Sequence, residues 1–454
     1  MPPVRSWSCL VGVLSLVLLT RAPCRSQPIR ILIDPEQTFQ TMEGWGGSLY
    51  PQTLPYFSED STFEDHLLTD LHTTHIRLRN VWYLLEAEND NDDPFEMDYD
   101  RLAAADTGLV HDELVLQQRL QERGVHLLFS SWRFPYWMIG KPPDWIPGAD
   151  DKPDLPPGMD DEYVESLLGY LLYARDRYSI TFDAISVANE PDLSIYIGGL
   201  DPERLLRLSW KLRDRLDAAG YKTSFYMPDV AAADSIGQIY TERFYALEGG
   251  RHAADAIAFH SYRREDEVLR YFGDLGALLG LPVWVTEQNH AGLAVENRFE
   301  WSHAVNNAAC LHDVLVRSNA SLSLYWSYAM SSSRGLGLYV PETKTWAPAY
   351  DMLKHFYNFV PPGSKRIESV PIEAEGGLRT VAFIRPDSLS AALIIINEGS
   401  EPIKARVAAA DAEFLMTRVV TSTAASHLAE TAVDSVLTLA PMSITTAEFQ
   451  RQQE

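Results

Sequence analysis

Cysteine is scarce in this chain, whose 454 residues contain only three. Cys9 and Cys24 lie in or beside an apolar N-terminal segment, so Cys310 is the only cysteine in the remainder. One cysteine cannot form an internal disulfide. Exported domains with small cores are usually stabilised by disulfides. The fold must therefore be stabilised by packing, and a hydrophobic content of 46% over this length is enough for a large core.

Positive charge is also in short supply. The chain has 38 Lys and Arg against 63 Asp and Glu, which gives a formal net charge of −25. Such a charge disfavours nucleic acid and anionic lipid as partners. A neutral or weakly charged substrate is favoured over a polyanion.

Long apolar runs are lacking beyond the N-terminus. Residues 9–20 are apolar but too few to span a bilayer comfortably, Arg5 precedes them, and Ser26 is a suitable last residue before cleavage. We expect a signal peptide over residues 1–26 and a secreted or periplasmic protein that is not inserted in a membrane after cleavage. An uncleaved N-terminal anchor and a lipoprotein attached at Cys24 are the alternatives.

Several catalytic motifs are missing. The chain has no G-x-S-x-G elbow, no P-loop, no G-x-G-x-x-G after a strand and no H-E-x-x-H pair. We therefore expect no cofactor and no metal. The stretch NDNDDP (89–94) contains calcium-binding residue types, but it lacks the glycine and distal glutamate of an EF-hand loop, so a solvated acidic loop is expected.

What the chain does contain is a regular alternation of short apolar runs with longer amphipathic stretches. The strand candidates are residues 43–48, 74–80, 125–131, 183–188, 223–228, 255–260, 282–287 and 321–328. Eight strands that alternate with helices predict an α/β fold, a closed (β/α)₈ TIM barrel over residues 41–360. An open doubly wound sheet is the alternative, because both folds have right-handed crossovers.

The pattern of apolar and polar residues changes after PPG (361–363). Runs such as AALIIINEG and VLTLAPMSITTAEF indicate β-strands separated by turns, with no long helical pattern between them. An all-β sandwich over residues 361–454 is predicted, and residues 28–40 are expected to join it.

Two glutamates stand where apolar strands meet loops. Glu190 follows AISVAN, and Glu287 follows VWVT. In a barrel these are the ends of strands four and seven, so both carboxylates point into the mouth at the C-terminal face. Two carboxylates across a cleft are the machinery of glycoside hydrolysis, in which one donates a proton and the other attacks. Taken alone, either glutamate is better explained as an ordinary exposed residue at a strand end or as half of a structural ion pair, and only the two together with their neighbours favour catalysis.

Polar neighbours of the two glutamates strengthen the hypothesis. Asn189 is placed to bond a sugar hydroxyl, although capping a turn is its other explanation. Arg77 and Arg79 share one face of strand two, and an arginine in the mouth would hold a nucleophilic carboxylate ionised and oriented. The sequence leaves open which arginine does so, and a surface ion pair is the alternative for each.

Strand six ends in FHSY, which brings His260 and Tyr262 to the same face. Tyr262 is placed to bond the nucleophile, whereas His260 is either a substrate contact or a core histidine. Four tryptophans lie near strand ends, namely Trp45, Trp132, Trp137 and Trp326. Aromatic faces stack on sugars and also fill cores. Trp326 is the best candidate for a sugar platform, Trp132 is a second, and about half of the others are expected to be packing residues.

These motifs carry a family resemblance. The stretches EGWGGSLYP (43–51), FSSWRFPYWM (129–138), ISVANEPD (185–192), FHSY (259–262), VWVTEQN (283–289) and YNFVPPGSKRI (357–367) resemble glycoside hydrolase family 30. The resemblance extends from about residue 30 to 450. The Asn-Glu-Pro and Thr-Glu motifs are shared by a wider clan of barrel hydrolases, whereas the opening GWGG, the PPGSKRI bridge and the trailing β-module narrow it to this family.

The resemblance implies a retaining β-glycosidase built from a (β/α)₈ barrel and a side β-sandwich. It implies that Glu190 is the acid/base and Glu287 the nucleophile. By the same motifs, Arg77 and Asn189 resemble the residues that flank the two glutamates. Tyr262 and Trp326 resemble subsite residues.

The function predicted is a secreted retaining β-glycoside hydrolase, whose partner is a poly- or oligosaccharide. Substrates known for the family include β-1,6-glucan or β-1,6-galactan, glucuronoxylan and glucosyl lipid, and the first two are favoured. A carbohydrate-binding protein on an inactive hydrolase scaffold and a transglycosylase are the alternatives. The sequence does not indicate an oligomeric state.

Overall fold

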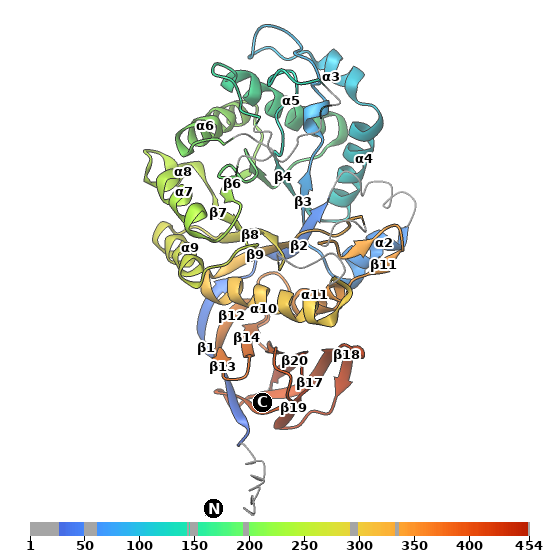
Figure 1. The fold of residues 1–454 in the computed structure, drawn as a ribbon, viewed down its shortest axis with the longest axis vertical. Coiled ribbons are helices and arrows are strands. Elements are labelled where there is room, and N and C mark those ends of the chain that lie inside the picture. Colours follow the sequence, from blue (N-terminus) through green and yellow to red (C-terminus); the bar gives the residue numbers. More distant parts are fainter. Residues whose placement is uncertain are drawn as a thin grey trace, which may run out of the picture.

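The structure of the chain is a computed structural model that describes residues 27–49, 61–142, 145, 153–193, 199–290, 298–331 and 336–452. Figure 1 shows two parts, a barrel surrounded by helices and a β-domain beneath it. The predicted signal peptide over residues 1–26 lies outside the described residues. Among those that are described, no helix combines the length and apolarity needed to cross a bilayer.

Eight parallel strands close into a barrel. They are β2 (Gly44–Leu49), β3 (His75–Arg79), β4 (His126–Ser130), β5 (Ala184–Ser186), β6 (Ser224–Val230), β7 (Ala256–His260), β8 (Val283–Gln288) and β9 (Ala320–Tyr325). β2 pairs with β9 as well as with β3, which closes the ring. The predicted barrel is therefore confirmed, and the open doubly wound sheet is wrong.

Helices and short turns of helix link the strands and cover the outside of the barrel (Figure 1). They are α2 (Ser61–Asp65), η2 (His66–Asp70), η3 (Trp82–Leu84), α3 (Tyr99–Ala105), α4 (Gly108–Glu122), α5 (Asp160–Tyr178), α6 (Pro202–Ala218), α7 (Ser235–Ala246), α8 (Gly250–Ala253), α9 (Asp266–Leu279), α10 (Trp301–Arg317) and α11 (Ala349–Tyr357). Local chemistry sets their ends. Asp201 caps α6 by accepting the Arg204 N–H at 2.6 Å, and Gly280 ends α9 with a φ of 63°.

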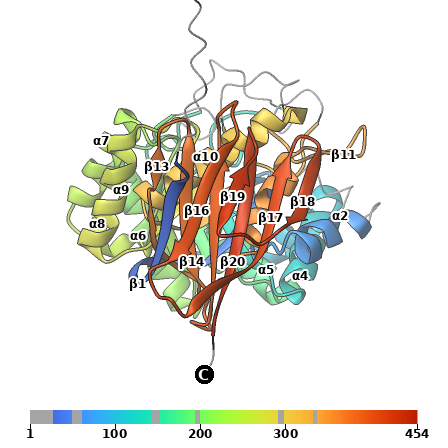
Figure 2. The same ribbon diagram turned by 90° about the horizontal axis from the view of Figure 1, so that it is seen from below.

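A small hairpin precedes α11, formed by β10 (Tyr339–Val340) and β11 (Thr345–Trp346). The β-domain is a ten-stranded sheet (Figure 2). Its strands are β1 (Ile29–Thr41), β12 (Lys365–Val370), β13 (Glu373–Ala374), β14 (Leu378–Ile384), β15 (Ser390–Asn397), β16 (Ile403–Ala409), β17 (Phe414–Thr423), β18 (Ser426–Thr431), β19 (Val436–Leu439) and β20 (Ser443–Arg451). β1 comes from the other end of the chain and lies between β12, antiparallel to it, and β16, parallel to it.

β15 shows why this sheet is apolar on both faces. Leu393 and Ile395 point into the core of the β-domain, while the alternate residues Ile394 and Ile396 join the core shared with the barrel helices. All four side chains are buried. The continuous run of apolar residues is therefore explained by a sheet that packs on itself with one face and on α10 and α11 with the other.

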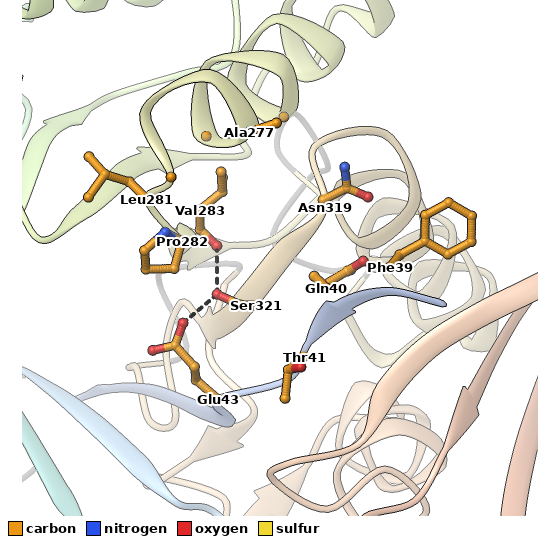
Figure 3. A pocket seen from close by; sticks show the side chains of 13 residues that line it. Phe39, Gln40, Thr41, Glu43, Ala277, Leu281, Pro282, Val283, Asn319 and Ser321 are labelled. Atoms are coloured by element: carbon orange, nitrogen blue, oxygen red, sulfur yellow. Dashed lines mark hydrogen bonds between the residues drawn. The ribbon is translucent and has the colours of Figure 1, made fainter. Parts of the chain in front are cut away.

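A cavity of about 340 Å³ lies where β1 meets the barrel (Figure 3). It is lined by residues before β2, at the end of α9 and at the starts of β8 and β9. Glu43 accepts hydrogen bonds there from Ser321 Oγ at 2.7 Å and Trp284 Nε1 at 3.1 Å. This is the end of the barrel at which the strands begin, so the cavity is far from the face where barrel enzymes build their sites.

The shared core generates a prediction. Ile394→Ala should lower the free energy of unfolding by about 2–5 kcal/mol, because it leaves a cavity between the sheet and the helices. Leu278→Ala is the matched control, since that side chain is 81% exposed and its loss should change stability by less than about 0.5 kcal/mol. Urea denaturation of both variants checks this, and equal effects would contradict the packing described.

Candidate active site

Glu190 lies beyond its strand rather than at its tip. The fourth barrel strand, β5, ends at Ser186, which is earlier than the predicted residue 188. The chain then bends, and Glu190 adopts a left-handed φ of 49° while its N–H donates to the Asp229 carbonyl at 3.1 Å. Non-glycine residues adopt this conformation only where the surroundings enforce it, and such positions concentrate at functional sites.

Glu287 lies within β8 and is almost completely buried. Arg77 Nη1 donates to its Oε1 at 2.6 Å, and the Tyr262 hydroxyl donates to its Oε2 at 2.5 Å. Both carboxylate oxygens are therefore held in place. Burial raises the pKa of Glu287, and the positive charges of His260 and Arg77 oppose that rise.

Arg77 connects the strands of the mouth. Its guanidinium is fully buried, and Nη2 donates to Asn189 Oδ1 at 2.6 Å, Asp229 Oδ2 at 2.9 Å and Ser130 Oγ at 3.0 Å. The sequence left open which arginine on β3 contacts Glu287. In the structure Arg77 does so, and the side chain of Arg79 lies outside the described part.

His260 lies between the two glutamates and is fully buried. Its Nδ1 is 2.8 Å from Glu190 Oε1 and 3.6 Å from Glu287 Oε2, and its Nε2 is 3.4 Å from Asp229 Oδ1. Burial alone would lower the pKa of His260, but the surrounding carboxylates of Glu287, Asp229 and Glu190 raise it to about 10. His260 is therefore an imidazolium at neutral pH, and both ring nitrogens can donate.

Asp229, at the end of β6, is a site residue that the sequence did not single out. It accepts from Arg77 and from Thr286 Oγ1, the latter at 2.5 Å. Burial would raise the pKa of Asp229, but Arg77, His260 and Thr286 hold it well below its usual range. The signal in the sequence is a charged residue inside the apolar run FYMPDV, next to Pro228.

Asn189 is held from two sides. Its N–H donates to the Ser131 carbonyl at 2.8 Å, and its Oδ1 accepts from Arg77. Its Nδ2 is buried and has no hydrogen-bond partner in the described part of the chain. A buried donor without a partner is costly, so this amide is set to donate to a ligand.

The four tryptophans lie in two kinds of environment. Trp132 and Trp326 stack on each other, with ring centroids 5.0 Å apart and planes 14° apart, beside Tyr262. Trp45 and Trp137 have packing contacts instead. Trp45 is fully buried and its Nε1 donates to the Val360 carbonyl at 2.6 Å, while Trp137 Nε1 donates to the Glu86 carbonyl at 3.1 Å.

The residue types at this site suit proton transfer better than metal binding. One ligand atom each from Glu190, His260 and Glu287 lie within 4.8 Å of one another, a spacing that an ion could use. However, Arg77 and the His260 imidazolium already supply positive charge to these carboxylates. A further cation would have to displace one of them.

Family models match both parts of the chain. Residues 181–334 match a glycosyl hydrolase catalytic core, and residues 363–447 match the β-sandwich domain of glycosyl hydrolase family 30. Lysosomal acid glucosylceramidase from Mus musculus is 22% identical over 429 residues, which cover 85% of this chain and 81% of that protein. The chain is therefore a glycoside hydrolase. Within that class, the matches confirm the resemblance to family 30.

Solved structures agree in fold. The catalytic domain of xylanase C from Talaromyces cellulolyticus gives a TM-score of 0.72 at 17% identity and covers 93% of this chain and 100% of that one. An endo-β1,6-glucanase gives a TM-score of 0.69 at 17% identity and covers 95% of each chain. At these identities the likeness shows a shared fold.

The charge arrangement around His260 generates a prediction. Asp229→Asn should lower the pKa of His260 below about 10, because it removes one of the carboxylates that raise it. A raised histidine pKa contributes stability that is full below pH 6.5 and is lost as the pH rises through about 10, so the variant should lose stability at a lower pH than the wild type.

Carbon-13 NMR of histidine-labelled protein, titrated from neutral pH to well beyond pH 10, measures the pKa shift directly. Asp255→Asn is the matched control, since that carboxylate pairs with Arg213 at 2.8 Å away from the site and should leave His260 unchanged. Identical titrations in Asp229→Asn and the wild type would show that Asp229 does not set the charge of His260.

Proposed function

We propose that the chain is a retaining β-glycoside hydrolase in which Glu190 is the acid/base and Glu287 the nucleophile. The observation that carries the proposal is the close approach of the two carboxyl groups, with an oxygen of each within 4.8 Å. Retaining enzymes have carboxyl groups about 5–5.5 Å apart, whereas inverting enzymes need about 6.5–9.5 Å to leave room for water. The spacing supports retention.

In the first step, Glu190 donates its proton to the glycosidic oxygen as a carboxylate oxygen of Glu287 attacks the anomeric carbon. The bond to the leaving group breaks, and an ester forms between the sugar and Glu287. Arg77 and Tyr262 fix both oxygens of Glu287 before the reaction, which reduces the entropy lost in reaching the transition state.

In the second step, the Glu190 carboxylate takes a proton from water as that water attacks the anomeric carbon. The ester bond breaks and Glu287 is released as a carboxylate. His260 hydrogen-bonds Glu190 Oε1 at 2.8 Å and keeps the carboxyl group aimed at the cleft through both steps. The free Nδ2 of Asn189 is suited to a hydroxyl of the sugar bound at this centre.

The proposed substrate is a neutral β-glycan, with β-1,6-linked glucan or galactan favoured. The net charge of −25 supports a neutral chain, and an endo-β1,6-glucanase shares the fold. The stacked Trp132 and Trp326 beside Tyr262 supply an aromatic wall for sugar rings. Secretion after removal of residues 1–26 remains part of the proposal.

Two alternatives share the scaffold. A protein that only binds carbohydrate would not need both carboxylates, and here each is held by charged or polar partners, which favours catalysis. A transglycosylase uses the same residues and differs only in whether the second acceptor is water or a sugar. Product analysis with an added acceptor sugar separates it from a hydrolase.

The two glutamates should respond differently to substitution. Glu287→Gln should abolish turnover because no ester can form. Glu190→Ala should reduce cleavage of natural glycans by about 10²–10⁴-fold, yet form the ester readily from an aryl glycoside whose leaving group needs no proton. Burst kinetics with the aryl glycoside measures this, and NMR of the first product should show the retained anomer. An inverted anomer would contradict the mechanism.

Substrate choice is checked by release of reducing sugar from β-1,6-glucan, β-1,6-galactan, glucuronoxylan and a glucosyl lipid. We expect at least about tenfold higher kcat/KM on one of the β-1,6-linked polymers than on glucuronoxylan, a difference of about 1.4 kcal/mol in transition-state binding. Glu287→Gln is the control for contaminating activity. Preference for glucuronoxylan would refute the proposed substrate while leaving the mechanism intact.

A further inference from the structure

A second group of carboxylates lies apart from the two catalytic glutamates. Glu86 follows η3, Asp90 lies in the loop that continues from it, and Glu165 lies on α5. One carboxylate oxygen from each of the three lies within 4.8 Å of the others. Glu162 is one helical turn before Glu165 on the same face of α5.

Glu86 and Glu165 are buried with few hydrogen-bond donors, of which Ser166 Oγ donates to Glu86 Oε2. Glu86 is 7% and Glu165 is 3% exposed. Glu86 Oε1 and both carboxylate oxygens of Glu165 have no hydrogen-bond partner among the residues described, and the buried Glu162 Oε2 and Asn89 Oδ1 also have none. Buried polar atoms are almost always partnered, so the orphaned oxygens of Glu86 and Glu165, which lie close to each other, point to a missing donor or cation.

Positive charge is missing as well. Within the described ranges, no Lys, Arg or His lies within 4.0 Å of a carboxylate oxygen of Glu86, Glu162 or Glu165. The nearby Arg215 is engaged by Asp161 at 3.1 Å and by the Pro94 carbonyl at 2.7 Å. A charge of this kind needs compensation, since an uncompensated buried carboxylate is strongly unfavourable.

In a comparable cluster elsewhere in the chain, arginine side chains neutralise the carboxylates. His312, Asp313 and Glu373 also have ligand atoms within 4.8 Å of one another. There, Arg379 Nη1 bridges Asp313 at 2.6 Å and Glu373 at 2.9 Å, and Arg317 contacts both as well. That cluster is an ion-pair network, whereas the one at Glu86 and Glu165 lacks such cations.

A divalent cation held between these carboxylates would satisfy their orphaned oxygens and cancel the repulsion between them.

We propose that Glu86, Asp90 and Glu165 bind a calcium ion, with Glu162 as a supporting oxygen donor. Calcium takes six to eight oxygen ligands at about 2.3–2.6 Å, so ligand atoms on opposite sides of it are about 5 Å apart, and carboxylate oxygens that lie within 4.8 Å of one another can reach one ion. Glu86 and Asp90 also line a cavity of about 310 Å³.

This inference revises the expectation drawn from the stretch NDNDDP. The contiguous pattern is not an EF-hand, and within it Asp90 bonds locally, accepting from the Asp98 N–H at 2.5 Å and from Asn91 Nδ2 at 3.0 Å. The proposed ligands instead come from a loop and a helix that are far apart in the sequence. Bound calcium would join the segment after β3 to α5.

The test compares thermal unfolding of the full chain in millimolar CaCl₂ and in EDTA. Calcium should raise the Tm of the wild type by at least about 2 °C, because it binds only the folded state. Glu165→Gln should abolish the calcium response and raise the Tm in EDTA, because it removes a buried negative charge. Glu88→Gln is the matched control on the same loop, with a side chain that is 82% exposed, and should respond like the wild type.

Equilibrium dialysis against ⁴⁵Ca²⁺ measures binding directly and should find one ion per wild-type chain and none in Glu165→Gln. Absence of a calcium response in the wild type, an unchanged response in Glu165→Gln, or an equal response to MgCl₂ would each overturn the proposal. A higher Tm for Glu165→Gln in EDTA without calcium binding by the wild type would show that the cluster holds protons only.

Discussion

The buried guanidinium of Arg77 is the contact on which the geometry of the site depends. It bonds to groups on or just after four different barrel strands, including the carboxylates of Asp229 and Glu287. With His260 protonated, Arg77 and His260 supply two positive charges against the three negative charges of Glu190, Asp229 and Glu287. The proposed mechanism places a proton on Glu190. The net charge of these five side chains is then zero, and a low dielectric disfavours any uncompensated charge.

The carboxylate cluster at the barrel mouth and the one at Glu86 and Glu165 differ in how their buried negative charge is balanced. At the barrel mouth, burial of acids is balanced by an arginine and an imidazolium from neighbouring strands. At Glu86 and Glu165, no such partner is present among the described residues, so the balance is left to protons or to an ion from solvent. The first arrangement has its charge built in, and the second makes local stability respond to the medium.

The sequence was most informative where burial imposes a pattern. Each of the eight barrel strands begins and ends within three residues of its expected place, because buried parallel strands are apolar runs bounded by turns. The proximity of Glu190 and Glu287 was predictable because strand ends in a barrel converge. Asp229 and the early end of β5 were not, since a backbone bend and a side chain buried by distant partners leave no periodic signal. The oxygen cluster at Glu86 and Glu165 was missed because its members meet only through tertiary packing.

The position of β1 has a consequence for the order in which the chain acquires its structure. Its neighbours β12 and β16 begin at Lys365 and Ile403, so β1, which ends at Thr41, waits for 365 − 41 = 324 residues before even the first of them is synthesised. At ~5–20 residues per second this delay is roughly 16–65 s. During that time Ile31 and Ile33, which end up buried, have no sheet to join. Ribosome-bound chains of this protein therefore expose an unpaired apolar strand for longer than the barrel takes to emerge, which makes β1 a natural target for chaperones.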